Sequence, residues 1–310
     1  MYFPYFRGRQ YELLALRELA QNGLLGSRVV PVVEPIKVTS TFGQTVKLFT
    51  DKKQPIALIL NPVVGELSKG SAISSVLPFV VNSVIPSVIM SKDTVDAITA
   101  LSAKSISKKN VLAVMTNRDF LDIYNESFSS SPAKFTLFPD ERQIRRAISE
   151  NKVMFEDKFK KQEKNSDYLN QEDEFFSDDH LFFDDEGFVG FGDYSIVGNE
   201  YIESGFAPYA VAIHIVYFSD DDILRVRHFV SDSNDDISDV AGKFHEAVMK
   251  LKIWFDGGQS RQLTTALSTL LNHAENGYYP GLPTIKKLSI MHHLELVGKY
   301  LDTHDGGRQK

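Results

Sequence analysis

The chain has 310 residues, of which 43% are hydrophobic and 24% are charged, and its formal net charge is −7. This composition is typical of a folded globular protein with a sizeable core. The chain contains no cysteine, which excludes disulfides, thiolate nucleophiles and cysteine-ligated zinc or iron–sulfur sites, and which is typical of a reducing compartment.

Two further features bear on location and partners. The N-terminal residues carry charges where a signal peptide needs an apolar core, and the longest apolar tract, residues 76–90, is shorter than the roughly 20 residues of a spanning helix. We therefore expect a soluble, cytoplasmic protein with no membrane contact. Residues 156–186 contain twelve acidic residues and four lysines, so the rest of the chain has no basic excess that would indicate non-specific nucleic-acid binding.

Short apolar segments alternate with helix-like segments through the first half of the chain. A first helix is expected over residues 11–22, where Leu13, Leu16 and Ala20 share one face. The segments predicted to be buried strands are residues 29–35, 56–62, 84–90, 111–117, 134–140 and 153–157. Alternating strands and helices predict a parallel sheet, and the lack of a glycine-rich phosphate loop after the first strand favours a TIM-like (β/α) barrel over a Rossmann sheet.

The second half of the chain has a different pattern. Residues 158–186 are charged and poor in aliphatic side chains, so we expect a solvent-exposed loop or insertion there. The elements predicted after it are a strand over residues 187–197, an antiparallel hairpin over 210–218 and 223–230, and helices over 240–254, 262–272 and 285–301, the last one amphipathic. The predicted fold is therefore an α/β, TIM-like barrel with an antiparallel hairpin in its last strands and C-terminal helices, forming one barrel-like domain over residues 1–310.

Polar residues end most of the predicted strands. Catalytic groups of a (β/α) barrel lie at the C-terminal ends of its strands. The residues at these ends are Glu34, Asn61, Asn117, Asp140, Glu156 and Asp157. Glu34 is the strongest candidate, because a carboxylate inside the apolar run VVPVVEPIK needs a partner or a function. The alternative stays open that turns alone explain these polar residues.

The predicted hairpin contains two histidines. His214 lies opposite His228 if the loop has three residues, 220–222, and opposite Arg227 if the loop has four. Together with Asp193 on the preceding strand, the two histidines are candidate ligands of a divalent metal. With Glu34 added, the same residues are the candidate catalytic set. The alternative is that both histidines are core residues with backbone partners.

Three weaker patterns leave alternatives open. Residues 231–236, SDSNDD, suit a hard cation or a turn before a helix, and we favour the turn. Pro139, Asp140 and residues 156–158 match the PD…(D/E)xK pattern of magnesium nucleases, but the segment between them is helix-like where that fold needs a hairpin. His292 and His293 are adjacent on one helix, so we expect one to face the core and one the solvent.

The N-terminal segment YFPYFRGRQYE interleaves aromatic rings with Arg7 and Arg9. Grooves that bind single-stranded nucleic acid combine the same residue types. We favour the alternative, in which the rings close one end of the barrel and the arginines pair with carboxylates.

Several blocks resemble one known group of proteins. These blocks are MYFPYFRGRQYELLALREL, VVPVVEPIK, GFGDYSIVGNEYIESGFAPYAVAIHIVYF, RHFVSDSNDD and PTIKKLSIMHHLEL. They are similar to the uncharacterised beta family proteins, related to phage-type beta protein, and to a shorter bacterial branch of unknown function. The resemblance implies a partner-dependent component of a phage-defence or mobile-element module, which binds a small nuclease-like protein or nucleic acid. The alternative function is a metal-dependent hydrolase, such as a nuclease or phosphodiesterase, with its site at the barrel mouth.

Overall fold

The computed structural model describes residues 1–81, 83–203, 208–258 and 261–304. The chain forms two compact units: Met1–Asp157 with Asp179–Tyr194, and Lys158–Asp178 with Ser195–Lys310. The expectation of one domain over residues 1–310 stays a prediction, because compact units need not fold independently.

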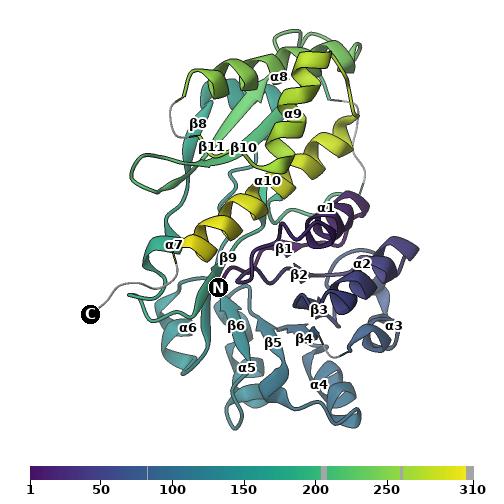
Figure 1. Cartoon of the computed structure of the whole chain (residues 1–310). Helices are drawn as coiled ribbons and strands as arrows, with labels where there is room; N and C mark the ends of the chain where they lie inside the picture. The colour runs from purple at the N-terminus through teal and green to yellow at the C-terminus, as the bar shows by residue number, and fades with distance from the viewer. Residues whose placement is uncertain (82, 204–207, 259–260, 305–310) are drawn as a thin grey trace. The chain divides into compact units, whose positions relative to one another are not determined.

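The first unit is a parallel sheet of eight strands in a nearly closed, TIM-like barrel, which confirms the predicted fold class (Figure 1). In sheet order the strands are β1 (Tyr5–Phe6), β2 (Val32–Val33), β3 (Ile56–Ile59), β4 (Val84–Ile89), β5 (Leu112–Val114), β6 (Phe135–Phe138), β7 (Lys152–Phe155) and β9 (Gly190–Gly192). The two edges of the sheet meet where Phe3 donates its amide to Phe191 and Tyr5 donates its amide to Asp193, both at 2.8 Å.

The apolar segments become strands because both of their faces are covered. Parallel strands of this kind are buried on both sides and therefore show continuous rather than alternating hydrophobicity. The barrel interior is a packed cluster from every strand of the sheet except β9, including Val32, Ile59, Leu112, Leu137 and Val153. The barrel is thus filled by side chains rather than open along its axis.

Helices follow the strands of the barrel in chain order. They are α1 (Gln10–Gln21), α2 (Ser40–Asp51), α3 (Ala72–Val76), α4 (Thr94–Ala103), α5 (Leu121–Phe128), α6 (Arg142–Ala147) and α7 (Asp179–Phe182). The start of α2 is fixed by Thr39, whose hydroxyl accepts the amide of Phe42 at 3.1 Å, as the N-cap rule predicts.

The second unit contains a three-stranded antiparallel sheet in the order β10 (Ala212–Phe218), β11 (Leu224–Val230), β8 (Asp173–Ser177). The predicted hairpin is therefore confirmed, and it lies in this separate sheet. The charged segment 158–186, expected as a loop or an insertion, contains a 3₁₀ helix (Asn165–Asn170), β8 and α7. The acidic residues of β8 make this segment resemble a solvated loop in the sequence. In the structure they pair with side chains of the sheet.

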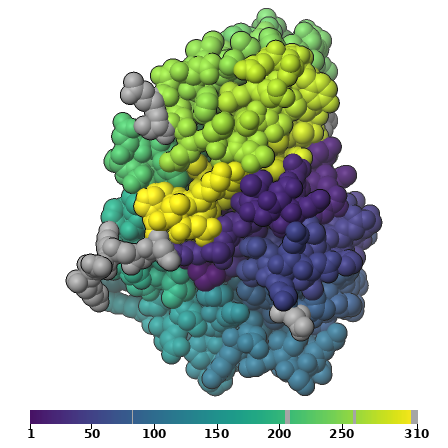
Figure 2. Space-filling view, viewed as in Figure 1, coloured from purple at the N-terminus to yellow at the C-terminus, as the bar shows by residue number. Residues whose placement is uncertain are grey.

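Three helices complete the second unit: α8 (Val240–Asp256), α9 (Thr265–Asn276) and α10 (Leu282–Thr303). In the space-filling view, the green and yellow atoms of this C-terminal region form one continuous surface (Figure 2). The predicted amphipathic character of α10 was wrong, since every residue from 288 to 298 is buried. α10 packs against β10 and α9, so it is covered on most of its circumference.

The last strand of the barrel requires its two glycines. A Cβ at Gly190 would lie 2.5 Å from the carbonyl oxygen of Met1, and one at Gly192 would lie 2.4 Å from that of Phe3. Gly192→Ala should therefore lower the free energy of unfolding by about 1–3 kcal/mol, the usual cost of overpacking.

Urea unfolding followed by circular dichroism measures this change. The control is Gly43→Ala within α2, where the new Cβ meets nothing closer than 3.5 Å and should stabilise the helix by about 0.5–1 kcal/mol. Equal stability of the two variants would contradict the account of barrel closure.

Candidate functional site

Glu34 lies directly after β2 and is fully buried. One carboxylate oxygen accepts the Tyr5 hydroxyl at 2.7 Å and the guanidinium of Arg7. The other oxygen accepts the backbone amides of Val63 at 2.7 Å and Val64 at 3.3 Å. All four lone-pair positions of the carboxylate are therefore occupied by protein donors, and Glu34 anchors the loop after β3. A catalytic role for Glu34 stays a prediction.

Arg7 lies among aromatic rings as well as beside Glu34. Its guanidinium carbon is 5.3 Å from the ring centre of Tyr5 and 5.6 Å from that of Tyr194. Burial, followed by the charge of Glu34, holds the pKa of Tyr5 well above its ordinary value. These contacts confirm, for Arg7, the prediction that an N-terminal arginine pairs with a carboxylate.

Asp193 follows β9 at the C-terminal end of the strand and is 3% exposed. Its Oδ1 accepts the buried hydroxyl of Tyr2 at 2.8 Å. Burial, and next the charge of Asp193, raises the pKa of Tyr2 well above its ordinary value, so the phenol stays protonated and keeps donating. Asp193 is thus part of the hydrogen-bond network within the barrel unit.

The nuclease pattern is not supported by the strand geometry. Its two parts end β6 and β7, and these strands pair in parallel with α6 between them, whereas the pattern requires an antiparallel hairpin. The carboxylate of Asp140 is held by two hydrogen bonds from Arg145, at 2.7 and 2.6 Å. The motif therefore occurs by chance in this chain.

The segment SDSNDD is a turn, as favoured from the sequence. Asn234 donates its side-chain amide to the carbonyl of Ser231 at 2.7 Å, and the amides of Asp232 and Ser233 donate to Glu246. Helix α8 then begins after Asp239, whose side chain accepts the amide of Gly242.

Of the two hairpin registers left open by the sequence, the structure has the one with the three-residue loop. The amide of Ser219 donates to the carbonyl of Ile223, which leaves a three-residue loop, and His214 lies opposite His228. Asp222 adopts a left-handed conformation with φ of 59°, as the third residue of such loops does. The two Nδ1 atoms are 2.7 Å apart, so the rings share one hydrogen bond.

Glu174, a residue that the sequence analysis missed, continues this contact from β8. It is 4% exposed, and its Oε1 lies 3.2 Å from Nε2 of His228. Its other oxygen forms an ion pair with Lys160 at 3.3 Å. Residues 174–176 alternate as a strand does, since Glu174 and Phe176 are buried while Phe175 is exposed. The acidic residues around them obscure this strand pattern in the sequence.

The hydrogen bonds assign the tautomer of each ring. A carboxylate only accepts, so His228 carries its proton on Nε2, and neutral His228 then accepts at Nδ1. His214 must therefore donate from Nδ1, which leaves its Nε2 as an unprotonated acceptor. This arrangement, Glu174–His228–His214, is called the histidine relay below.

Burial keeps the two imidazole rings of the relay neutral. Desolvation, then the charges of His228 and Lys286, hold the pKa of His214 well below its usual 6.5. Desolvation also lowers the pKa of His228, against the opposing effect of the hydrogen bond to Glu174. The rings of Phe159 and Tyr168 provide this desolvation, with ring centres 5.0 and 4.7 Å from that of His214. His214 is therefore an available proton acceptor at pH 7.

The relay ends at a cavity. His214 is half-buried and lines a space of about 240 Å³ in the second unit. The cavity wall includes Lys161 and Lys286, and none of its described lining residues is acidic. An imidazole acceptor beside a cationic wall can take a proton from a bound water or hydroxyl group.

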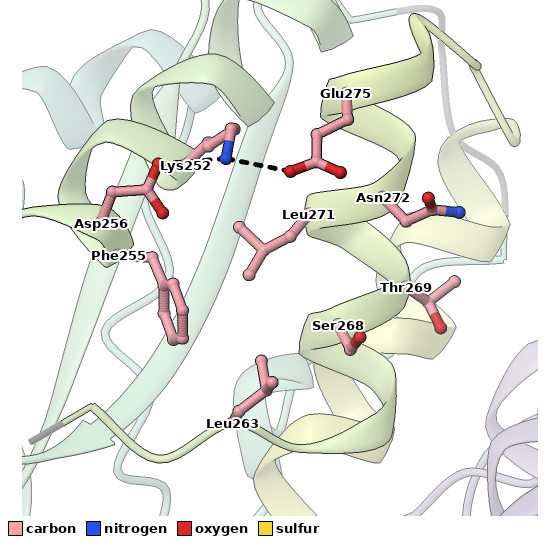
Figure 3. Close-up of a pocket in the computed structure, with 9 residues that line it drawn as sticks. All are labelled: Lys252, Phe255, Asp256, Leu263, Ser268, Thr269, Leu271, Asn272 and Glu275. Atoms are coloured by element: carbon pink, nitrogen blue, oxygen red, sulfur yellow. Dashed lines mark hydrogen bonds and ion pairs between the residues drawn. The ribbon is translucent and has the colours of Figure 1, made fainter.

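A second cavity, of about 490 Å³, lies between α8 and α9 (Figure 3). Its lysine, Lys252, pairs with Asp256 at 3.0 Å and with Glu275 at 3.1 Å, and the other labelled polar residues are amides and hydroxyls. Among the described residues that line this cavity, the one lysine is thus paired with both carboxylates, and the cavity offers less chemistry than the relay.

The predicted site residues fall into two groups. Glu34 and Asp193 belong to the barrel unit, and His214 and His228 belong to the second unit. Within the described ranges, no three histidine, aspartate or glutamate side chains are grouped so that they could hold a metal ion. The roles of these residues in catalysis and metal binding stay predictions, and the described geometry joins the two histidines to Glu174.

Both histidines of α10 are buried, so the expectation that one faces solvent was wrong. His292 donates from Nε2 to the carbonyl of Val216 at 2.7 Å and accepts the Thr264 hydroxyl at Nδ1. His293 lies 2.9 Å from the hydroxyl of Ser195. Burial lowers the pKa of His292 to about 4 and that of His293 to about 3.

Comparisons with known proteins yield no relatives: no family model, curated protein or solved structure matches this chain. The resemblance to beta family proteins therefore stays a prediction. In the described part of the chain, no helix combines the length and apolar character needed to cross a bilayer.

The tautomers can be observed directly. Nitrogen-15 NMR of histidine-labelled protein at pH 7 should show His228 protonated at Nε2 and His214 protonated at Nδ1. Glu174 fixes the proton of His228 on Nε2, and the free Nδ1 of His228 then requires a proton on Nδ1 of His214. His245→Gln, which removes an exposed histidine, serves as an assignment control. A His228 ring protonated at Nδ1 would contradict the relay.

Acid should destabilise the second unit through His292 and His293. Both are neutral when folded but bind protons below pH 6.5 when unfolded, so stability is lost as the pH falls from 6.5 towards 4. At pH 5 each should cost about 2 kcal/mol. Urea unfolding monitored by Trp254 fluorescence measures the free energy of unfolding at each pH. Between pH 6.5 and pH 5 this free energy should fall less in His292→Gln than in His245→Gln. An identical pH dependence in both variants would contradict this assignment.

Proposed function

We propose that this protein is a hydrolase in which His214 acts as the general base. The observation that supports it is the Glu174–His228–His214 relay, because its hydrogen bonds leave Nε2 of His214 as an acceptor and His214 lines a cavity. His214 is the catalytic residue, and Glu174 and His228 are positioning residues that fix its ring and tautomer.

The reaction follows from this geometry. Water beside His214 gives one proton to Nε2 while its oxygen bonds to the electrophilic carbon of an ester. The leaving oxygen then takes that proton as its bond to carbon breaks, so His214 returns to its neutral state. The charge that develops on the imidazole during transfer is stabilised through His228 by the Glu174 carboxylate, as in acid–base–nucleophile triads.

The low pKa of His214 has two opposing effects. It keeps the ring unprotonated at neutral pH, and it makes the ring a weaker base than an imidazole in water. The reaction therefore suits an activated or well-oriented substrate.

The predicted role in a phage-defence or mobile-element module, with a small nuclease-like protein or nucleic acid as partner, remains a proposal from the resemblance. It is compatible with hydrolysis, since a partner could supply or receive the substrate. The predicted divalent metal is likewise a proposal. The ester hydrolysis by His214 includes no step that involves a metal ion.

The test is hydrolysis of 4-nitrophenyl acetate, a neutral activated ester. Wild-type protein should accelerate the release of nitrophenolate above the buffer rate, and His214→Gln should lower kcat/KM by about 100-fold, a typical contribution of a general base. The matched control is His245→Gln, which removes an exposed histidine of α8 and should leave the rate unchanged.

Two results would contradict the proposal. One is a wild-type rate equal to that of buffer, and the other is full activity in His214→Gln. Circular dichroism of the variant distinguishes loss of the base from loss of the fold.

A further inference from the structure

The walls of the His214 cavity have a charge opposite to that of the whole chain. The chain has a net charge of −7, yet the described lining residues include Lys161 and Lys286 and no aspartate or glutamate. The remaining walls are largely apolar, with Phe159, Ile196 and Ile285 among them. A cationic, partly apolar cavity selects organic anions over neutral or cationic ligands.

Lys161 can accept such a ligand. Its Nζ lies 2.7 Å from Glu200, but the glutamate side chain is 62% exposed, so this is a weak surface pair. An ammonium group has three donors, and one carboxylate oxygen uses only one of them. A ligand anion can therefore bind Lys161 beside Glu200 or in its place.

Space for the rest of a ligand lies next to this cavity. Another cavity, of about 630 Å³ and called the outer cavity here, shares Asn165 and Pro208 with the His214 cavity. Asn165 is fixed by donating its side-chain amide to the carbonyl of Ala210 at 2.8 Å. The outer cavity is also lined by Tyr209, which is 59% exposed, and by the oppositely charged Glu163 and Lys164. A ligand larger than the inner 240 Å³ can thus extend outward.

We propose that the substrate is an organic anion, an ester whose carboxylate or phosphate group binds Lys161 and Lys286 while its ester group lies beside His214. The outer cavity takes the remainder of the molecule. This inference rests on the proposed hydrolase function and names the substrate class of the same site.

The experiment compares two esters that undergo the same reaction. Mono-4-nitrophenyl succinate carries a free carboxylate, and 4-nitrophenyl butyrate is a neutral ester of similar length. Wild-type protein should hydrolyse the succinate with a KM at least about tenfold lower, the size expected for a charge-assisted hydrogen bond to the anion. Raising the salt concentration should reduce this preference.

Lys161→Gln and Lys286→Gln should each remove most of the preference by raising the KM for the succinate ester. Lys104→Gln, at an exposed position of the barrel unit, is the matched control and should keep the preference. Inhibition of ester hydrolysis by inorganic phosphate is then compared with inhibition by succinate. The stronger inhibitor shows whether the site favours a phosphate or a carboxylate.

The outcomes separate the two proposals. If neither ester is hydrolysed, the proposed function fails. If both esters are hydrolysed through His214 with equal KM, or if the lysine variants keep the preference, the hydrolase stands and the anionic substrate class is overturned.

Discussion

The hydrogen bond between Glu174 and His228 is the interaction on which the candidate site depends. Without a carboxylate at Nε2, neutral His228 could carry its proton on either nitrogen, and the direction of its hydrogen bond with His214 would not be fixed. Glu174 removes that freedom, because a buried carboxylate accepts and does not donate. One side chain of β8 thereby determines the protonation of two rings on β11 and β10.

The polar groups at the barrel mouth have a different role from those of the relay. (β/α) barrels place their active sites at the C-terminal ends of the strands, which makes Glu34 and Asp193 natural candidates. In this chain Glu34 accepts four hydrogen bonds, two of them from the loop after β3, and Asp193 accepts the buried Tyr2 hydroxyl. These contacts stabilise the barrel, whereas the relay ends in an acceptor atom at a cavity wall. The second unit therefore carries the stronger candidate for chemistry.

Local patterns in the sequence predict much of this structure. Continuous apolar runs locate the barrel strands, and the three-residue loop sets the register that places His214 opposite His228. Glu174 and the donors to Glu34 are harder to predict, because they come from segments far away in the chain and are joined only by tertiary structure. The burial of α10 is also hard to predict, because its polar residues suggest a solvated face. His292 is nevertheless buried with partners in Val216 and Thr264, and Glu295 is buried with a partner in Thr265.

A double-mutant cycle between Glu174 and His214 tests the central claim, that Glu174 acts on the reaction only through the relay. Ester hydrolysis is measured for wild type, Glu174→Gln, His214→Gln and the double variant. If Glu174 acts only through the relay, Glu174→Gln lowers kcat/KM by about tenfold or more when His214 is present and has no effect when His214 is absent. The same fold-loss in both backgrounds would show that Glu174 acts independently of His214, and the relay would be contradicted.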